Sequence, residues 1–268
     1  MKSIRPYIEA TRWRINLFAV LLVIVSVKYA GGDLSASVLP AVAVFVVLCA
    51  TMVQNDLRDR QHDARMGKRH AAQNPRQYRL YATTLWLLSG LLAMAVWLDL
   101  GWQSGALIFL CIVTGLLYSE LLTVPVLPNL LVAGASSLTV LLVTLGQGNE
   151  DSGVLLLFVA VASVIHGREI LKDFEDHPHD IGHKWTWIQA VGETGAKRVA
   201  ALSLAVACLA TWLVLLQALG WVRLVALLWV PTVVQLAVRG SMSAKEASRI
   251  KSRVDVVMAL VLVALLFV

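Results

Sequence analysis

Two acid-rich segments of the chain share one spacing of aspartates. The pattern D-x-x-D-x-x-x-D occurs at Asp56, Asp59 and Asp63 and again at Asp173, Asp176 and Asp180. On a helix, residues four or eight positions apart lie on one face, so Asn55, Asp59 and Asp63 share a face. Asp176 and Asp180 share another. Stacked carboxylates repel one another, so each face predicts bound cations. Oxygen-only ligands favour Mg²⁺, which commonly takes one or two carboxylates together with the phosphates of a substrate.

Basic residues beside both segments favour phosphate as the partner of these cations. Lys68 and Arg69 follow the first segment, and Arg168 and Lys172 precede the aspartates of the second. Carboxylates alone would repel a phosphate, whereas carboxylates mixed with cationic side chains indicate metal–phosphate chemistry. A single cluster of this kind is also what a solvated loop presents. Two clusters with matched spacing favour a site in which both acidic faces bind one diphosphate through Mg²⁺.

The segments that must position these residues are strongly apolar. The chain of 268 residues is 58% hydrophobic and 15% charged, against roughly 25% charged residues in a soluble domain. Apolar stretches of membrane-spanning length recur along it. We predict an all-α, polytopic membrane protein with nine transmembrane helices, at about residues 13–31, 35–54, 80–99, 103–119, 129–146, 153–171, 199–219, 221–238 and 254–268.

The positions of the acid-rich segments predict an internal duplication. Each segment follows an even-numbered predicted helix, and the second lies four helices after the first. This pattern indicates two four-helix repeats, at about residues 12–120 and 128–238, with an extra helix at about 254–268. We expect residues 1–268 to form one domain around a central cavity that opens on the side of the acidic loops.

The distribution of Lys and Arg predicts the orientation in the membrane. Of the 23 basic residues, all except Lys28 and Arg223 lie in the N-terminal segment or in and beside the loops on the side of the acid-rich segments. Cytoplasmic loops carry the basic excess, so the N-terminus and the acidic loops are expected in the cytoplasm and the C-terminus on the opposite side. The net charge of +6 is then a signal of topology and of contact with membrane lipids, and it does not indicate nucleic-acid binding.

Three motifs occur along the chain in a characteristic order. They are "NDLRDRQHD" at residues 55–63, "YSELLTVPVLPNLLVA" at 118–133 and "REILKDFEDHPHD" at 168–180. The first matches NDxxDxxxD, the last is similar to REIxKDxEDxxGD, and the middle one resembles a signature in which Tyr-Ser precedes Gly-Asn. Together they resemble the UbiA superfamily of intramembrane prenyltransferases, over essentially the whole chain.

The resemblance implies roles for the residues at the matching positions. The implied ligands of the two Mg²⁺–diphosphate sites are Asn55, Asp56, Asp59 and Asp63 for one and Asp173, Asp176 and Asp180 for the other. The implied catalytic residues are Asp59, Asp63, Asp176, Asp180 and Tyr118, a tyrosine near the reacting carbon. The residues implied to bind substrate are Asn55, Lys68, Arg69, Ser119, Asn129, Arg168 and Lys172.

The implied reaction is the Mg²⁺-dependent transfer of an isoprenoid group from a polyprenyl diphosphate to a hydrophobic or amphipathic acceptor. Departures from the family pattern leave the acceptor open between an aromatic or quinone precursor and a glycerol-phosphate lipid. Thr123 stands where many members have a lysine, Pro128 and His179 each replace a glycine, and "MGKRHAAQNPRQY" replaces a run like RPxRPIPSG.

Other functions are compatible with parts of this pattern. A terpene cyclase of the same superfamily would need no separate acceptor. A cation transporter would use the paired acids as an ion path, but transport sites usually lie near mid-membrane, whereas these acids lie at its rim. The stretch "HPHDIGH" at residues 177–183 offers three imidazoles to zinc or iron, although polar loop residues account for them as well.

Overall fold

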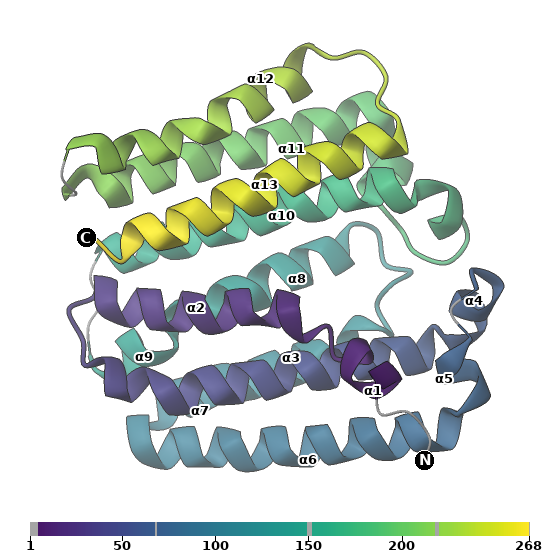
Figure 1. Cartoon of the computed structure of the whole chain (residues 1–268), viewed down its shortest axis with the longest axis horizontal. Helices are drawn as coiled ribbons and strands as arrows, with labels where there is room; N and C mark the ends of the chain where they lie inside the picture. The colour runs from purple at the N-terminus through teal and green to yellow at the C-terminus, as the bar shows by residue number, and fades with distance from the viewer. Residues whose placement is uncertain (1–4, 68, 149–151, 218–219, 268) are drawn as a thin grey trace.

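The fold consists of helices packed side by side. The structure is a computed structural model that describes residues 5–67, 69–148, 152–217 and 220–267. Every regular element in these ranges is a helix, and no strand occurs within them. The long helices run roughly along one direction of the molecule (Figure 1). The expectation of an all-α fold is therefore confirmed.

The first half of the chain forms a group of packed helices. Its elements are α1 (Arg5–Ala10), α2 (Trp13–Tyr29), η1 (Leu34–Ser37), α3 (Val38–Arg58), α4 (Arg60–Arg65), α5 (His70–Gln73), α6 (Pro75–Leu100) and α7 (Trp102–Tyr118). α3 packs against α2, α6 and α7. Val23, Val44 and Ile108 are among the buried residues that join these helices in one apolar cluster.

The second half supplies most of another apolar cluster. Its elements are α8 (Leu127–Leu138), α9 (Leu141–Gly146), α10 (Ser152–Asp180), α11 (Trp187–Val214), η2 (Leu215–Gln217), η3 (Gly220–Trp229), α12 (Val230–Val238) and α13 (Ala244–Leu265). α10 packs against α8, α11 and α13, around buried residues such as Ile170, Leu204 and Trp229. The two clusters do not divide the chain at the boundary between the predicted repeats, because Leu22 and Val25 of α2 belong to the second cluster and Leu142 and Val143 of α9 belong to the first. The duplication itself stays a prediction.

The nine segments predicted to span the membrane are mainly helical, but they differ in length and regularity. Four helical stretches in the described ranges are long and apolar enough to cross a membrane, namely Leu34–Arg58, Pro75–Leu100, Ser152–His177 and Trp187–Val214. Shorter apolar helices cover Trp102–Tyr118, Leu127–Leu138 and Val222–Val238. Nine transmembrane spans therefore stay a prediction.

The outer face of α6 is suited to lipid. Leu80, Leu87, Leu91 and Leu98 lie along one side of this helix, and the least exposed of them, Leu87, is 67% exposed. A continuous stripe of exposed leucines is unfavourable in water and is typical of a helix that faces acyl chains.

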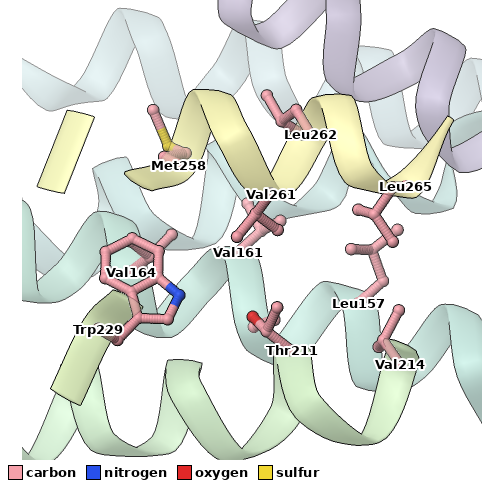
Figure 2. Close-up of a pocket in the computed structure, with 11 residues that line it drawn as sticks. Leu157, Val161, Val164, Thr211, Val214, Trp229, Met258, Val261, Leu262 and Leu265 are labelled. Carbon is pink, nitrogen blue, oxygen red and sulfur yellow. The ribbon is translucent and has the colours of Figure 1, made fainter. Parts of the chain in front are cut away.

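An apolar pocket lies within the second half, among α10, α11, η3 and α13 (Figure 2). Thr211, Trp229 and Met258 are among its lining residues, and none of these lining residues is charged. A diphosphate placed there would lose its hydration without gaining a counter-charge. The pocket is therefore not a candidate for the diphosphate site.

Candidate active site

The first acid-rich segment crosses the junction between α3 and α4. α3 ends at Arg58, and Asp59 lies between the two helices. The backbone N–H of Asp59 donates to the carbonyl of Asn55, and the N–H of Asp63 donates to the carbonyl of Asp59, both at 2.8 Å. The i to i+4 pattern of a helix therefore continues through the junction. Asn55, Asp59 and Asp63 remain stacked along one side, as their spacing predicts.

The second acid-rich segment lies within α10, which runs without a break from Ser152 to Asp180. Asp176 and Asp180 are one turn apart, and the charges of Asp173, Asp176 and Lys172 all act on Asp180. The predicted carboxylates therefore lie close together, with a lysine beside them.

The two segments contact each other through His183, which follows α10. Its Nε2 atom lies 3.3 Å from Oδ1 of Asp59. Its ring stacks on that of His62 in α4, with 4.1 Å between the ring centroids and 5° between the planes. The backbone N–H of Trp185 also donates to the carbonyl of Leu122, at 2.9 Å, and so links the loop after α10 to the loop after α7. α4 and the last turns of α10 accordingly lie at the same end of the bundle (Figure 1).

The protein leaves part of the negative charge of this cluster uncompensated. Burial raises the pKa of Asp59; the charge of His183 opposes this effect, and the neighbouring Asp63 carboxylate adds to it. Burial also raises the pKa of Asp180; Lys184 opposes this effect, and Asp176 and Asp173 add to it. A carboxylate held in this way gains from a nearby cation, and such groups are typical of functional sites.

These shifts predict that Asp59→Asn raises the unfolding temperature of the metal-free protein at about pH 7. The folded-state pKa of Asp59 lies above its ordinary value of 3.8. The contribution of Asp59 to stability is therefore fully present below pH 3.8, where the carboxyl group is protonated in both the folded and the unfolded state. This contribution is lost as the pH rises through the raised pKa of the folded state. Asparagine has no such loss, so the variant gains about 1.4 kcal/mol for each unit by which the pKa is raised. Thermal unfolding midpoints in EDTA, measured over a pH series, check this.

Asp99→Asn is the matched control, because Asp99 is an exposed carboxylate at the far end of α6. Its midpoint should follow that of the parent at every pH. A destabilised Asp59→Asn variant at neutral pH, or a gain that does not shrink as the pH falls, would contradict the prediction.

Asp173 is fully buried, and both of its carboxylate oxygens are bonded to protein. Lys184 Nζ donates to Oδ1 and Asn129 Nδ2 donates to Oδ2, each at 2.7 Å. Burial tends to lower the pKa of Lys184, but the Asp173 carboxylate more than offsets this, so the pKa lies above its usual value. Lys184 is therefore charged. The three side chains tie α8, α10 and the loop after α10 together.

Two further predicted site residues also have protein partners. Arg168 Nε donates to Asp255 on α13 at 2.6 Å, and its NH1 group donates to Glu169 at 2.8 Å. Asp56 accepts a hydrogen bond from Arg12 at 3.1 Å. The charges of Arg168 and Asp56 are thus compensated within the protein, whereas those of Asp59 and Asp180 are compensated only in part.

The end of α7 borders both acid-rich segments. The charges of Lys172 and Lys184 act on Tyr118. Ser119 Oγ donates to Oδ1 of Asn55 at 3.4 Å. The structure therefore brings Tyr118, Ser119 and Asn55 to the same cluster as the predicted carboxylates.

The predicted basic residues of the first loop are not seen in this cluster. Lys68 lies outside the described residues. Arg69 is exposed where α5 begins, and within the part of the chain that the structure describes it makes no hydrogen bond or ion pair with the acidic segments.

Two residues of this cluster, His183 and Lys184, were not among the predicted site residues. Both lie just beyond the second motif. The sequence indicated His183 only as one of the three imidazoles of "HPHDIGH", and Lys184 only as one of the basic residues of the loops. Lys184 donates its backbone N–H to the carbonyl of Asp180, at 3.0 Å, across the turn that follows α10, in which Gly182 has a φ of +80°.

The donor set fits Mg²⁺ bound together with phosphate. Within the described ranges, no group of three or more His, Cys, Asp and Glu residues is arranged to hold a metal by itself. Mg²⁺ commonly binds through one or two carboxylates and completes its octahedron with water and substrate phosphates. The neighbouring oxygens of Asp59 and Asp63, and those of Asp176 and Asp180, are of this kind.

Comparison with known protein families decides which family the chain belongs to. The profile of the UbiA prenyltransferase family matches residues 16–266. The chain belongs to this family. The resemblance inferred from the motifs is thereby confirmed. Members of the UbiA family are membrane proteins, in agreement with the apolar helices of this chain.

Solved structures of UbiA proteins share the fold. A structure of digeranylgeranylglyceryl phosphate synthase has a TM-score of 0.75 at 20% identity and covers 99% of this chain and 98% of its own. A UbiA homologue from Aeropyrum pernix K1 has a TM-score of 0.72 at 18% identity, with coverages of 94% and 95%. One from Archaeoglobus fulgidus, bound to GPP and Mg²⁺, has a TM-score of 0.68 at 16% identity, with coverages of 94% and 96%. No curated protein matches the chain.

Proposed function

We propose that the protein transfers an isoprenoid group from a polyprenyl diphosphate to a lipid-soluble or amphipathic acceptor, with Mg²⁺ as cofactor and diphosphate as product. The observation that carries this proposal is the contact between the two acid-rich segments, where His183 lies 3.3 Å from Asp59. Membership of the UbiA family supports prenyl transfer in general. Archaeoglobus fulgidus homologues have been solved with GPP or DMAPP and Mg²⁺, which supports the proposed donor and cofactor.

In this proposal the two acidic faces hold the two ends of one metal–diphosphate assembly. Asn55, Asp59 and Asp63 would bind Mg²⁺ on one side, and Asp176 and Asp180 on the other. Bound Mg²⁺ would stabilise the negative charge that develops on the diphosphate as the C–O bond breaks. Because Asp59 and Asp180 are partly buried and only partly compensated, they favour a cation over open solvent.

Residues on α7 and α10 would act on the two products of bond cleavage. Lys172, beside the second acidic face, would bind diphosphate oxygens. The ring of Tyr118 would stabilise the allylic cation, a contact worth roughly 0.5–2 kcal/mol. Apolar helices would exclude water from that cation until the acceptor attacks. The proposal places the central cavity, the N-terminus and the acidic loops on the cytoplasmic side, and Ser119 beside the substrates.

Three predicted residues are assigned a positioning role because their charges are already paired. Asp173, with Asn129 and Lys184, would fix the last turns of α10. Arg168 would hold α10 to α13 through Asp255. Asp56 would hold the start of α2 through Arg12. These residues would shape the site, and Asn55, Asp59, Asp63, Asp176 and Asp180 would bind the metal.

The test is turnover by the purified full-length chain in lipid. Labelled prenyl diphosphates of several lengths are incubated with Mg²⁺ and either a glycerol-phosphate ether lipid or an aromatic quinone precursor. Diphosphate release and labelled lipid product are measured together. We expect release that requires Mg²⁺ and one acceptor class, and that stops in EDTA.

Other outcomes identify other functions. Release without an acceptor, with a labelled hydrocarbon product, would replace transfer by terpene cyclisation. Cation flux into proteoliposomes with no diphosphate release would overturn the proposal in favour of transport.

A further inference from the structure

A second pocket lies between the end of α10 and the first turns of α13. Its volume is about 450 Å³, within the range of small-molecule sites. The residues that line it are Glu175, Ala244, Lys245, Ser248, Arg249 and Ser252. Glu175 belongs to the second motif, but its side chain faces α13 and contacts Lys251 there. The pocket is therefore distinct from the acid-rich cluster.

The charge of this pocket is positive. Its carboxylate, Glu175, is compensated by an ion pair with Lys251 and a hydrogen bond with Ser248. The other carboxylate on these turns of α13, Glu246, is bonded to Arg239. Lys245 and Arg249 are exposed, and neither makes an ion pair with any residue that the structure describes. Two cations therefore remain to attract an anion.

The same face of α13 becomes apolar beyond the pocket. Lys245, Arg249 and Ser252 are followed at helical spacing by Val256, Leu260 and Val263, so that all six lie on one stripe. Val256 is 60% exposed, Leu260 46% and Val263 53%. A cationic pocket that continues into an exposed apolar stripe matches a lipid, whose phosphate headgroup would bind the pocket and whose acyl chain would contact the stripe. A soluble phosphate would contact only the cationic pocket.

We propose that this pocket binds the headgroup of an anionic phospholipid, whose acyl chain lies along the exposed apolar stripe of α13. The site adds to the proposed prenyl transfer and does not depend on it. Lys245 and Arg249 supply the attraction for the phosphate, and Val256, Leu260 and Val263 supply the contact that selects a lipid.

The test uses the full-length protein in detergent, with phosphatidylglycerol or phosphatidylcholine added, and native mass spectrometry to measure bound lipid. The parent should bind phosphatidylglycerol more tightly than phosphatidylcholine. Lys245→Gln/Arg249→Gln should weaken phosphatidylglycerol binding about 30-fold, or about fivefold for each charge. Because both side chains are exposed, the variant should unfold at the temperature of the parent.

Arg65→Gln/Arg69→Gln is the control, because it also removes two exposed cations, from the end of α4 and the start of α5, which are too short to carry an apolar stripe. Its phosphatidylglycerol binding should match that of the parent. Equal losses in both variants, equal binding of the two lipids, or displacement of the lipid by glycerol 3-phosphate would each overturn the proposal. The last result would instead identify a site for soluble phosphate.

Discussion

Asp59→Asn and Asp176→Asn are each expected to lower the turnover number about 10²- to 10³-fold, the loss typical of removing one preorganised electrostatic group. Asparagine keeps the size of the side chain and one oxygen, but it removes the negative charge that the proposed Mg²⁺ would bind. One variant alters the acidic face formed by α3 and α4 and the other alters that of α10, so both halves are tested. Initial rates at saturating Mg²⁺ and prenyl diphosphate provide the measurement.

Both variants should remain folded and inserted in the membrane. Asp59→Asn should even gain stability without metal, since burial disfavours its charged form. Loss of activity with unchanged or higher stability separates a functional carboxylate from a structural one. Asp99→Asn, at the other end of the bundle, should keep the turnover of the parent. Normal turnover in both test variants at saturating Mg²⁺ would rule out the assignment of this site.

Local spacing predicted the acidic faces well, because it depends only on the helical repeat. Asn55, Asp59 and Asp63 stay stacked even though the helix is assigned a break at Asp59, since the backbone hydrogen bonds continue through it. Their approach to the second segment was inferred only indirectly, from matched spacing in a predicted repeat. The contact itself is made by His183 and His62, whose positions depend on how the two loops fold over the ends of their helices.

Helix boundaries were predicted less well, for a physical reason. The hydropathy pattern marks the part of a helix that would lie in lipid, whereas backbone hydrogen bonding continues into polar residues. α10 thus continues to Asp180 and α11 begins already at Trp187, with a kink at Gly192, where φ is +71°. The segment predicted at about 129–146 is divided into α8 and α9. There the hydroxyls of Ser137 and Thr139 donate to carbonyls three residues earlier, which weakens the regular ladder.

Lys184 illustrates what the sequence does not reveal. In the sequence it is one of many basic residues in the loops on one side of the membrane. In the structure it is buried against Asp173, because the loop after α10 folds back toward the end of α7 and is fixed there by the hydrogen bond from Trp185 to Leu122. The same contact explains why Asp173, although part of the repeated motif, differs from Asp59 in having both carboxylate oxygens bonded to protein side chains.

Lys184→Met is expected to destabilise the protein by about 3–5 kcal/mol, the cost of removing one partner from a buried ion pair. Methionine fills a similar volume but leaves the Asp173 carboxylate with Asn129 alone. Asp173→Asn should likewise leave the ammonium group of Lys184 buried without a carboxylate partner. The double variant Asp173→Asn/Lys184→Met should lose less than the sum of the two single losses, because no uncompensated charge remains.

Unfolding midpoints of the two single variants and the double variant in one detergent give this coupling from a double-mutant cycle. Lys245→Met is the matched control, since Lys245 is exposed and its midpoint should stay near that of the parent. Additive losses in the cycle would mean that Lys184 and Asp173 do not stabilise each other. In that case Asp173 would be free to serve as a metal ligand, and the positioning role proposed for it would be wrong. A strong coupling would instead support the positioning role proposed for Asp173, the first carboxylate of the acidic pattern on α10.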